Sequence, residues 1–162
     1  ATYFVGGKTP APFEFKASPS SSVQIVPVDA GNIQEGGRQV TFAGDKLGRV
    51  TIVGEKPLDL SFQTNADMAL SFEYRIDAPA TKPVILAMGA GKLDVTPPTG
   101  APTGQWASVK IPLKCFQAAG ADVSKIAAPF DLGTAGTFQV SIANVKLTAD
   151  PAGAVCPARA AQ

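Results

Sequence analysis

The sequence predicts an all-β protein, folded as a two-sheet antiparallel β-sandwich with little helix. Short stretches in which apolar and polar residues alternate are separated by turns, and no segment carries an amphipathic helical stripe over three turns. The 16 Gly and 14 Pro among the 162 residues supply the turns and break helices. Alternation with a period of two is typical of strands with one face in the core and one in water. We therefore expect roughly nine or ten short strands.

The clearest strand is predicted at 68–76, where large apolar side chains occupy the even positions and small or polar ones the odd positions. Further strands are predicted at 23–28, 49–53, 58–62, 83–88, 106–113 and 138–147. Residues 84–86 are all apolar, which predicts a central strand covered on both faces. In the last strand the apolar positions change parity between Ile142 and Val145, so we expect a β-bulge near Ala143 and Asn144.

Two local signals limit the elements around 106–119. Pro112 cannot donate a ladder hydrogen bond, so the strand that contains it is expected to lie at a sheet edge or to end at Ile111. Residues 115–119 are long enough for one helical turn, which Gly120 would cap. This turn is the one helical element that we predict.

The chain is expected to form a single β-sandwich domain over 1–150, followed by an irregular C-terminal tail over 151–162 that is tied down by Cys156. The two cysteines, Cys115 and Cys156, stand 41 positions apart and so do not form a CxxC motif. They either form a disulfide, which we favour because a tail needs tying down, or remain free thiols. A disulfide predicts a periplasmic or secreted protein. Because the chain begins without Met or a signal peptide, we expect a mature or excised fragment.

Composition argues against several function classes. The chain has 14 basic and 13 acidic residues and a net charge of +1, without the basic excess of nucleic-acid-binding proteins. It has no His, which excludes Ser–His and Cys–His catalytic pairs and His-ligated zinc. No apolar run approaches the ~20 residues of a membrane helix. Most Asp and Glu residues stand in turn or solvated-surface contexts, so we expect no catalytic residues. From the charge balance and the lack of a long apolar run we expect no nucleic-acid partner and no membrane partner.

Trp106 is the residue that points most directly to a ligand. It shares parity with Ser108 and Lys110, on the polar face of its predicted strand. A Trp on such a face offers a flat ring on which a sugar can stack, while neighbouring charged and amide groups take the hydroxyls. The expected hydroxyl partners point away from the apolar rows of their own strands and are Glu73, Arg75, Lys110 and Gln139. The alternative is that Trp106 turns inward at the strand end and plugs the core.

No cofactor and no metal site are predicted. β-Sandwich binding modules often hold a structural calcium ion, and this is the one metal that we keep open. The chain lacks the Asp-rich loop of an EF-hand, and its candidate ligands Asp29, Asp45 and Asp150 are scattered. The N-terminus is rich in aromatic residues, which pack either on the sandwich or on a preceding domain: Tyr3, Phe4, Phe13 and Phe15.

Four segments resemble a known family: YFVGGK at 3–8, WASVKIPLKCF at 106–116, APF at 128–130 and IANVKL at 142–147. They resemble the C-terminal domain of bacterial family 3 glycoside hydrolases of the ExoP-like exo-β-1,3/1,4-glucanase and β-glucosidase type. The resemblance runs over nearly the whole chain and implies a galactose-binding-like jelly-roll fold. It also implies that an Asp nucleophile and a Glu acid, both in upstream domains absent from these residues, carry out the hydrolysis. The family fixes no sugar-contact residue that can be carried onto this sequence.

Three functions are therefore weighed. The first is a non-catalytic, carbohydrate-binding-module-like domain of a family 3 β-glucosidase or exo-β-glucanase, which holds β-glucan or a gluco-oligosaccharide weakly. The second is a structural domain that packs on the catalytic domains of the same chain without touching sugar. The third, an independent enzyme, is disfavoured by the lack of His and of paired carboxylates. The parity of Trp106 favours the first function, and the N-terminal aromatics favour the second.

Overall fold

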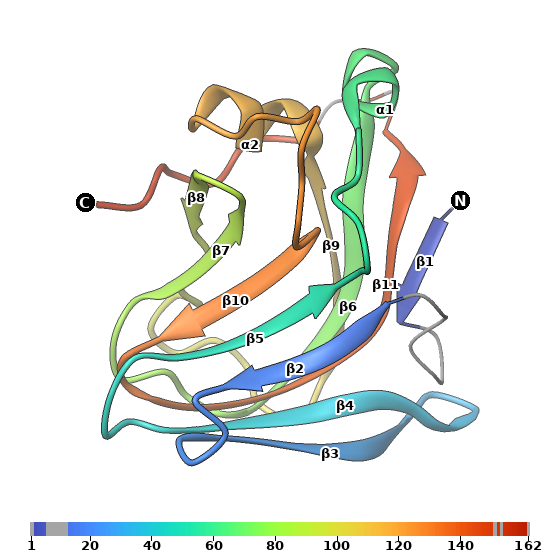
Figure 1. The fold of residues 1–162 in the computed structure, drawn as a ribbon. Coiled ribbons are helices and arrows are strands. Elements are labelled where there is room, and N and C mark those ends of the chain that lie inside the picture. The colour runs from blue at the N-terminus through green and yellow to red at the C-terminus, as the bar shows by residue number, and fades with distance from the viewer. Residues whose placement is uncertain (1, 6–12, 151, 153, 162) are drawn as a thin grey trace.

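The computed structural model describes residues 2–5, 13–150, 152 and 154–161, with side chains described from residue 13 onward. Figure 1 shows the elements in chain order. They are β1 (Thr2–Val5), β2 (Glu14–Ser18), β3 (Val23–Ala30), β4 (Ile33–Ala43), β5 (Gly48–Val53), α1 (Ser61–Asn65), β6 (Met68–Ala78), β7 (Val84–Met88), β8 (Gly91–Asp94), β9 (Trp106–Pro112), α2 (Leu113–Ala118), β10 (Phe130–Thr134) and β11 (Thr137–Ala149).

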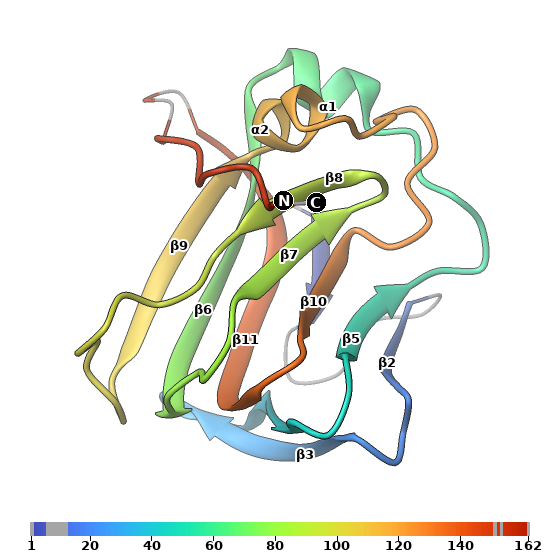
Figure 2. The same ribbon diagram turned by 90° about the vertical axis from the view of Figure 1, so that its left-hand side faces the viewer.

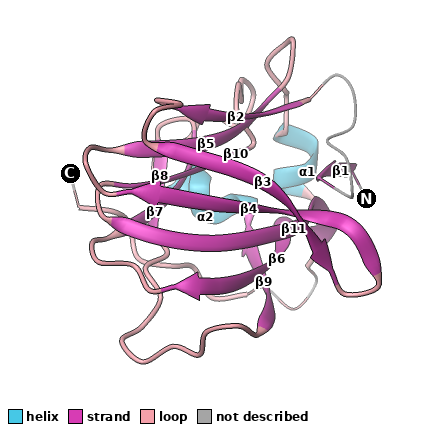
Figure 3. Ribbon diagram, turned by 90° about the horizontal axis from the view of Figure 1, so that it is seen from below, coloured by secondary structure: helices cyan, strands magenta, loops and turns pink. Residues whose placement is uncertain are grey.

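The strands form two antiparallel sheets that pack face to face. The six-stranded sheet has the order β3-β4-β11-β6-β9, with β1 paired to the second half of β11. The five-stranded sheet has the order β2-β5-β10-β7-β8. Figures 1 and 2 show the two layers with both helices at one end, and Figure 3 looks onto the six-stranded sheet. The predicted two-sheet antiparallel sandwich with little helix is thus confirmed.

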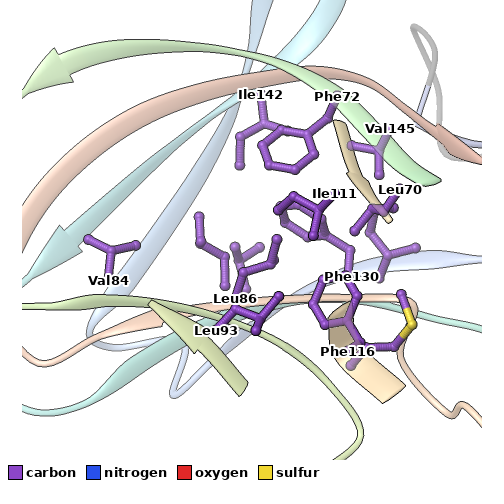
Figure 4. Close-up of a cluster of buried hydrophobic side chains, with 14 of the residues drawn as sticks. Leu70, Phe72, Val84, Leu86, Leu93, Ile111, Phe116, Phe130, Ile142 and Val145 are labelled. Carbon is purple, nitrogen blue, oxygen red and sulfur yellow. The ribbon is translucent and has the colours of Figure 1, made fainter. Parts of the chain in front are cut away.

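The hydrophobic core lies between the sheets. In Figure 4, Phe72 and Ile142 of the six-stranded sheet point toward Leu86 and Phe130 of the five-stranded sheet. The rings of Phe72 and Phe130 meet edge to face, with centroids 5.4 Å apart. Phe116 of α2 closes one end of the core and is fully buried. Burial of each such side chain contributes about 1.5–3 kcal/mol to the free energy of folding. The packed core holds the two sheets together and so fixes the position of their outer faces.

Most predicted strands are present, as β3, β5, β6, β7, β9 and β11. The prediction at 58–62 is wrong, because Leu58 makes only an isolated bridge to Ile126 and α1 begins at Ser61. Asp59 Oδ1 accepts a hydrogen bond from the Ser61 amide at 3.0 Å, which turns the chain out of an extended path. The strands β1, β2, β4, β8 and β10 were not predicted. In β4 the glycines Gly36 and Gly37, and in β10 Gly133, leave only short runs of alternation.

Three local predictions can be compared with the backbone. The bulge is confirmed, because the β11–β6 register shifts between Ala143 and Lys146, and Asn144 has a φ of 52°. Pro112 ends β9, which is an edge strand, as expected. Strand β7 is interior to its sheet, but Ile85 is partly exposed on the outer face, so that strand is fully covered on its inner face alone.

The C-terminal tail is attached to the sandwich in two ways. Cys115 of α2 and Cys156 form the predicted disulfide. Beyond it, the Asp94 amide donates to the Ala158 carbonyl at 2.8 Å, and the Ala160 amide donates to the Lys92 carbonyl at 3.0 Å. The tail therefore pairs with β8 and covers the edge of the five-stranded sheet.

Candidate functional site

The outer face of the six-stranded sheet carries all five predicted sugar-contact residues. We call it the Trp106 face and define it by the outward side chains Trp106, Ser108, Lys110, Ser71, Glu73, Arg75, Asp77, Gln139, Ser141, Gln39 and Thr41. The strand register places Trp106 opposite Arg75, Arg75 opposite Ser141, and Ser141 opposite Gln39. Strands far apart in sequence thus present one continuous row of side chains across β9, β6, β11 and β4.

Trp106 lies at the edge of this face and points outward. It belongs neither to the buried core nor to the side chains packed against it, and it is partly exposed. The Arg75 guanidinium carbon lies 5.2 Å from the centroid of the indole ring. A contact of this kind is worth about 0.5–1 kcal/mol at an exposed site and fixes the ring against β6. Because Arg75 covers one ring face, a ligand can stack only on the other.

Asp77 holds Arg75 in that position. Its carboxylate accepts hydrogen bonds from Arg75 Nε at 2.6 Å, from Ser141 Oγ at 2.6 Å and from Gln39 Nε2 at 3.1 Å. Arg75 Nη2 also donates to Ser141 Oγ at 3.2 Å. Four side chains from three strands are thus joined in one network, with Asp77 as the shared acceptor. This network fixes the geometry of the face before any ligand arrives.

The protonation state of Asp77 follows from the same contacts. Burial opposes ionisation, but the hydrogen bonds from Arg75, Ser141 and Gln39 outweigh it and lower the pKa of the carboxyl group below its ordinary value. A general acid in a glycosidase needs the opposite shift, so that it keeps its proton near neutral pH. Asp77 therefore acts as a fixed anion and not as a proton donor.

Glu73 and Lys110 lie further along the face, at the edge of a hollow of about 370 Å³. The hollow forms where β11 bulges, and its lining includes Ser108, Asn144 and Lys146. Asn144 Nδ2 donates to Glu73 Oε2 at 2.6 Å. The bulge that turns Val145 into the core thus also directs an amide toward Glu73. Here the Lys110 ammonium can donate hydrogen bonds to sugar hydroxyls, the free oxygen of Glu73 can accept them, and the Ser108 hydroxyl can do both.

Gln139 lies on the other side of Arg75. Its Nε2 donates to Thr41 Oγ1 at 2.9 Å, and the register aligns Gln139, Thr41 and Gln24 across three neighbouring strands. This row adds amide and hydroxyl groups without charge. The structure therefore brings the predicted residues onto one face, but spreads them over rows on either side of the Trp106–Arg75 contact.

Sequence reasoning missed the residues that organise the face, namely Asp77, Asn144 and Gln39. A signal for Asp77 existed, because it continues the odd-numbered polar positions 71, 73 and 75. The predicted strand ends at 76 and so leaves Asp77 outside it, whereas β6 continues to Ala78. Asn144 stands at the predicted bulge, but nothing in the sequence pairs it with Glu73.

The described residues contain neither a metal-ligand cluster nor a membrane-spanning helix. Within residues 2–5, 13–150, 152 and 154–161, no three Asp, Glu or Cys side chains gather into a group that could hold a metal ion. Two of the three candidate calcium ligands accept backbone hydrogen bonds close by in the chain: Asp29 Oδ1 accepts from the Glu35 amide, and Asp150 Oδ2 accepts from the Ala154 amide. In the same part of the chain, neither helix has the length and apolar character needed to cross a bilayer.

Several solved structures share the fold, among them the three that follow. The extra C-terminal domain (X) of exo-1,3/1,4-β-glucanase (ExoP) from a Pseudoalteromonas species is 16% identical, with a TM-score of 0.73, over 93% of this chain and 94% of that one. The exo-1,3/1,4-β-glucanase (ExoP) chain itself is 14% identical, with a TM-score of 0.72. The match covers 96% of the present chain but only 22% of the ExoP chain. A family 11 carbohydrate-binding module from Clostridium thermocellum, solved with a β-1,3-1,4-mixed-linked tetrasaccharide, is 13% identical, with a TM-score of 0.62, over 91% and 95% of the two chains.

A search of curated proteins finds no match. The model of the Exop_C family, described as galactose-binding domain-like, matches residues 6–147 of this chain. That range includes both sheets from β2 to most of β11 and all residues of the Trp106 face. The chain therefore belongs to the galactose-binding domain-like Exop_C family.

Proposed function

We propose that this chain is a non-catalytic accessory domain of a glycoside hydrolase and that it binds a β-glucan chain weakly through the Trp106 face. The proposal extends to a parent enzyme of the family 3 β-glucosidase or exo-β-glucanase type, secreted or periplasmic in a bacterium. The similar ExoP domain and the tetrasaccharide-bound module support a role in glycan binding. The disulfide fits an oxidising compartment.

One observation carries the proposal: an outward, partly exposed Trp is held by an arginine that is itself fixed by Asp77. Sugar rings bind to aromatic faces through their C–H groups, and a preorganised ring loses little freedom on binding. Elsewhere on the same face, the side chains of Ser108, Gln139 and Lys110 offer hydroxyl, amide and ammonium groups to a neutral, hydroxyl-rich ligand. The indole N–H makes no hydrogen bond within the described part of the chain, so it adds a donor.

Binding is expected to be weak. One open ring face and a few hydrogen bonds that compete with water give a dissociation constant of about 0.1–1 mM, or about 4–5.5 kcal/mol. On a domain tethered to catalytic domains, this affinity is sufficient, because tethering raises the local concentration of polymer at the active site. Hydrolysis itself would belong to those other domains.

The test is a titration of the 162-residue chain with laminari- and cello-oligosaccharides, followed by Trp fluorescence and NMR shifts. Trp106→Ala should abolish saturable binding, which is followed in this variant by NMR shifts alone because Trp106 is the one tryptophan of the chain. Phe62→Ala is the matched control, because Phe62 is an exposed aromatic, 79% accessible, on α1 and away from the face. It should bind as the wild type does.

Two results would contradict the proposal. The first is the absence of any saturable change in the wild type at tens of millimolar oligosaccharide. The second is unfolding on Trp106→Ala, with a loss of about 3–5 kcal/mol, which would make the ring a core residue. We expect a loss below about 1.5 kcal/mol, because the ring lies outside the core.

The second candidate function, packing on the catalytic domains without sugar contact, is favoured by the exposure of Phe62. The N-terminal aromatics support it less, because Phe13 and Phe15 pack against the core of the sandwich itself. The side chains of Tyr3 and Phe4 lie outside the described residues. If sugar titration fails, Phe62→Ser in the full-length parent should lower its unfolding midpoint, and an unchanged midpoint would exclude this alternative.

A further inference from the structure

The outer face of the five-stranded sheet, on the opposite side of the molecule from the Trp106 face, contains a second hollow. Its volume is about 390 Å³, within the roughly 300–1,000 Å³ range of small-molecule sites. We call it the Arg49 hollow and define it by its main lining residues Arg49, Lys82, Ile85, Ala87, Lys92 and Asp131. Nothing in the proposed function uses this surface.

The strand register explains why the sheet is hollow here. Arg49, Gly133, Ile85 and Asp94 form one outward row across β5, β10, β7 and β8, and Asp131, Ala87 and Lys92 form the next row across β10, β7 and β8. Asp94 lies outside the lining of the hollow. The floor is low because Gly133 and Ala87 carry little or no side chain, while the longer Arg49 and Lys92 stand on either side. A Cβ on Gly133 would meet Arg49 Cγ at 3.0 Å, so a larger residue there would fill the floor.

The C-terminal tail forms one wall. Ala160 and Ala161 line the hollow, and the Ala160 amide is bonded to the Lys92 carbonyl at 3.0 Å. The wall is attached to the sandwich by the Cys115–Cys156 disulfide. On the other side, Leu47 presents an exposed apolar side chain, 59% accessible. The hollow is therefore bounded on two sides and open above.

The charge of the lining is unbalanced. Asp131 is buried and engaged by Arg49, whose Nε donates to Oδ1 at 3.0 Å and whose Nη2 donates to Oδ2. This contact holds the guanidinium on the floor and raises its pKa, because the ion is stabilised by the hydrogen bond to Asp131. Lys82 and Lys92 are exposed and form no ion pair with any described residue. Three cations and one carboxylate leave the lining with a net charge of +2.

We infer that the Arg49 hollow binds an acidic saccharide, with the ammonium groups of Lys82 and Lys92 contacting its carboxylates or sulfates. Ala87, Ile85 and Leu47 would contact the C–H faces of the sugar, and the half-exposed Arg49 would donate its remaining N–H groups to hydroxyls. No aromatic ring lines the hollow, so charge takes the place of stacking. The choice of a saccharide over other polyanions rests on the proposed function, whereas the position and the charge preference do not.

The test uses the same chain with three probes: tetragalacturonate, the neutral cellotetraose and sodium sulfate. Backbone NMR shifts of Ala87 and Gly133 report on the Arg49 hollow, and those of Ser108 and Arg75 report on the Trp106 face. Tetragalacturonate should shift the signals of Ala87 and Gly133 with saturation. Its affinity should fall as salt rises, because exposed charges are screened. The double variant Lys82→Gln with Lys92→Gln should lower this affinity about fivefold to tenfold, as expected for two exposed ion contacts.

The matched control is Lys56→Gln with Lys125→Gln, which removes the same charge from two exposed lysines outside the lining. It should change tetragalacturonate affinity less than about twofold, the small effect expected of distant screened charges. Equal weakening by both double variants would overturn the inference, as would saturating shifts of Ala87 and Gly133 by cellotetraose. Sulfate that binds as tightly as tetragalacturonate would overturn the saccharide assignment. Because Trp106→Ala affects only the other face, failure of glucan binding and failure of this inference are distinguishable.

Discussion

Removing the disulfide tests how the C-terminal tail contributes to stability. Cys115 is 3% exposed within α2, whereas Cys156 is exposed in the tail, so Cys156→Ser breaks the bond without disturbing the core. The two residues are 41 positions apart. In the chain-entropy model, freeing a loop of this length from the crosslink lowers the free energy of unfolding by about 4 kcal/mol. That is a large fraction of the roughly 5–15 kcal/mol typical of a domain.

Urea unfolding followed by Trp106 fluorescence measures the loss. With a slope of about 2 kcal/mol per molar urea, the midpoint should fall by about 2 M. The wild type in a phosphine reductant should behave like Cys156→Ser. Val155→Ser is the control, because Val155 is 92% exposed in the same tail and makes no crosslink. Its midpoint should stay within about 0.3 M of the wild type, as for other surface substitutions.

A local readout separates tethering of the tail from global stability. The Asp94 amide donates to the Ala158 carbonyl, so its hydrogen exchange should accelerate in Cys156→Ser under native conditions. Amides in the centre of β7, away from the tail, should be less affected. A midpoint shift below about 0.5 M together with unchanged exchange at Asp94 would refute the reasoning, because the tail would then be held by its backbone hydrogen bonds alone.

Three further substitutions test the faces of the sandwich. Arg49→Met leaves the buried Asp131 carboxylate without its cation and should cost about 2 kcal/mol in chemical denaturation, while adding Asp131→Leu should restore most of it. Asp77→Asn should cost about 1–2 kcal/mol at pH 7. Since the folded-state pKa of Asp77 lies below its unfolded value near 3.8, its contribution is present above that pH and is lost on acidification. The advantage of the wild type over Asp77→Asn should therefore begin to decline near pH 4 and be lost as the pH falls through the lower folded-state pKa. Asn144→Val should lower the free energy of unfolding by about 1–2 kcal/mol, because a β-branched residue at a φ of 52° is strained. Asn144→Gly should lower it less. Equal losses in the two variants would refute the role of the bulge.

The strands that were predicted share a property that local sequence can show. In β6 the side-chain parity is regular along the strand, and in β11 it is regular on either side of the bulge, because one face of each strand packs in the core. In β9 the inward positions Val109 and Ile111 alternate with polar residues in the same way. Strand β4 begins with exposed residues and two glycines, and β10 is buried on both sides with Asp131 and Gly133 within it. The alternating runs in these two strands, Val40 to Phe42 and Phe130 to Leu132, are too short to predict a strand from local pattern alone. Residues 58–62 do alternate in polarity as a strand would, but α1 begins within them, at Ser61.

The candidate site shows where such prediction ends. That Trp106 points outward follows from parity within one strand. Arg75 covers the ring of Trp106 because β6 pairs with β9. Asp77 accepts hydrogen bonds from Gln39 and Ser141, which are 38 and 64 positions away in the sequence. Contacts of this kind depend on the register between distant strands, which no local pattern fixes. The individual residues of a sheet face can therefore be predicted from sequence, whereas their hydrogen-bond network cannot.

The two outer faces also show why the net charge of a chain is a poor guide to its ligands. The whole chain carries +1, which by itself argues against polyanionic partners. On the Trp106 face, Arg75 is paired with Asp77, and Glu73 accepts a hydrogen bond from Asn144, so much of its charge is engaged within the face. On the Arg49 hollow, Lys82 and Lys92 have no such partner among the described residues, and the lining alone carries +2. Screening limits exposed charges to about 8 Å at physiological salt, so a ligand in the hollow experiences the lining and not the sum over the chain. A chain with almost no net charge can thus favour neutral sugars on one sheet and acidic sugars on the other.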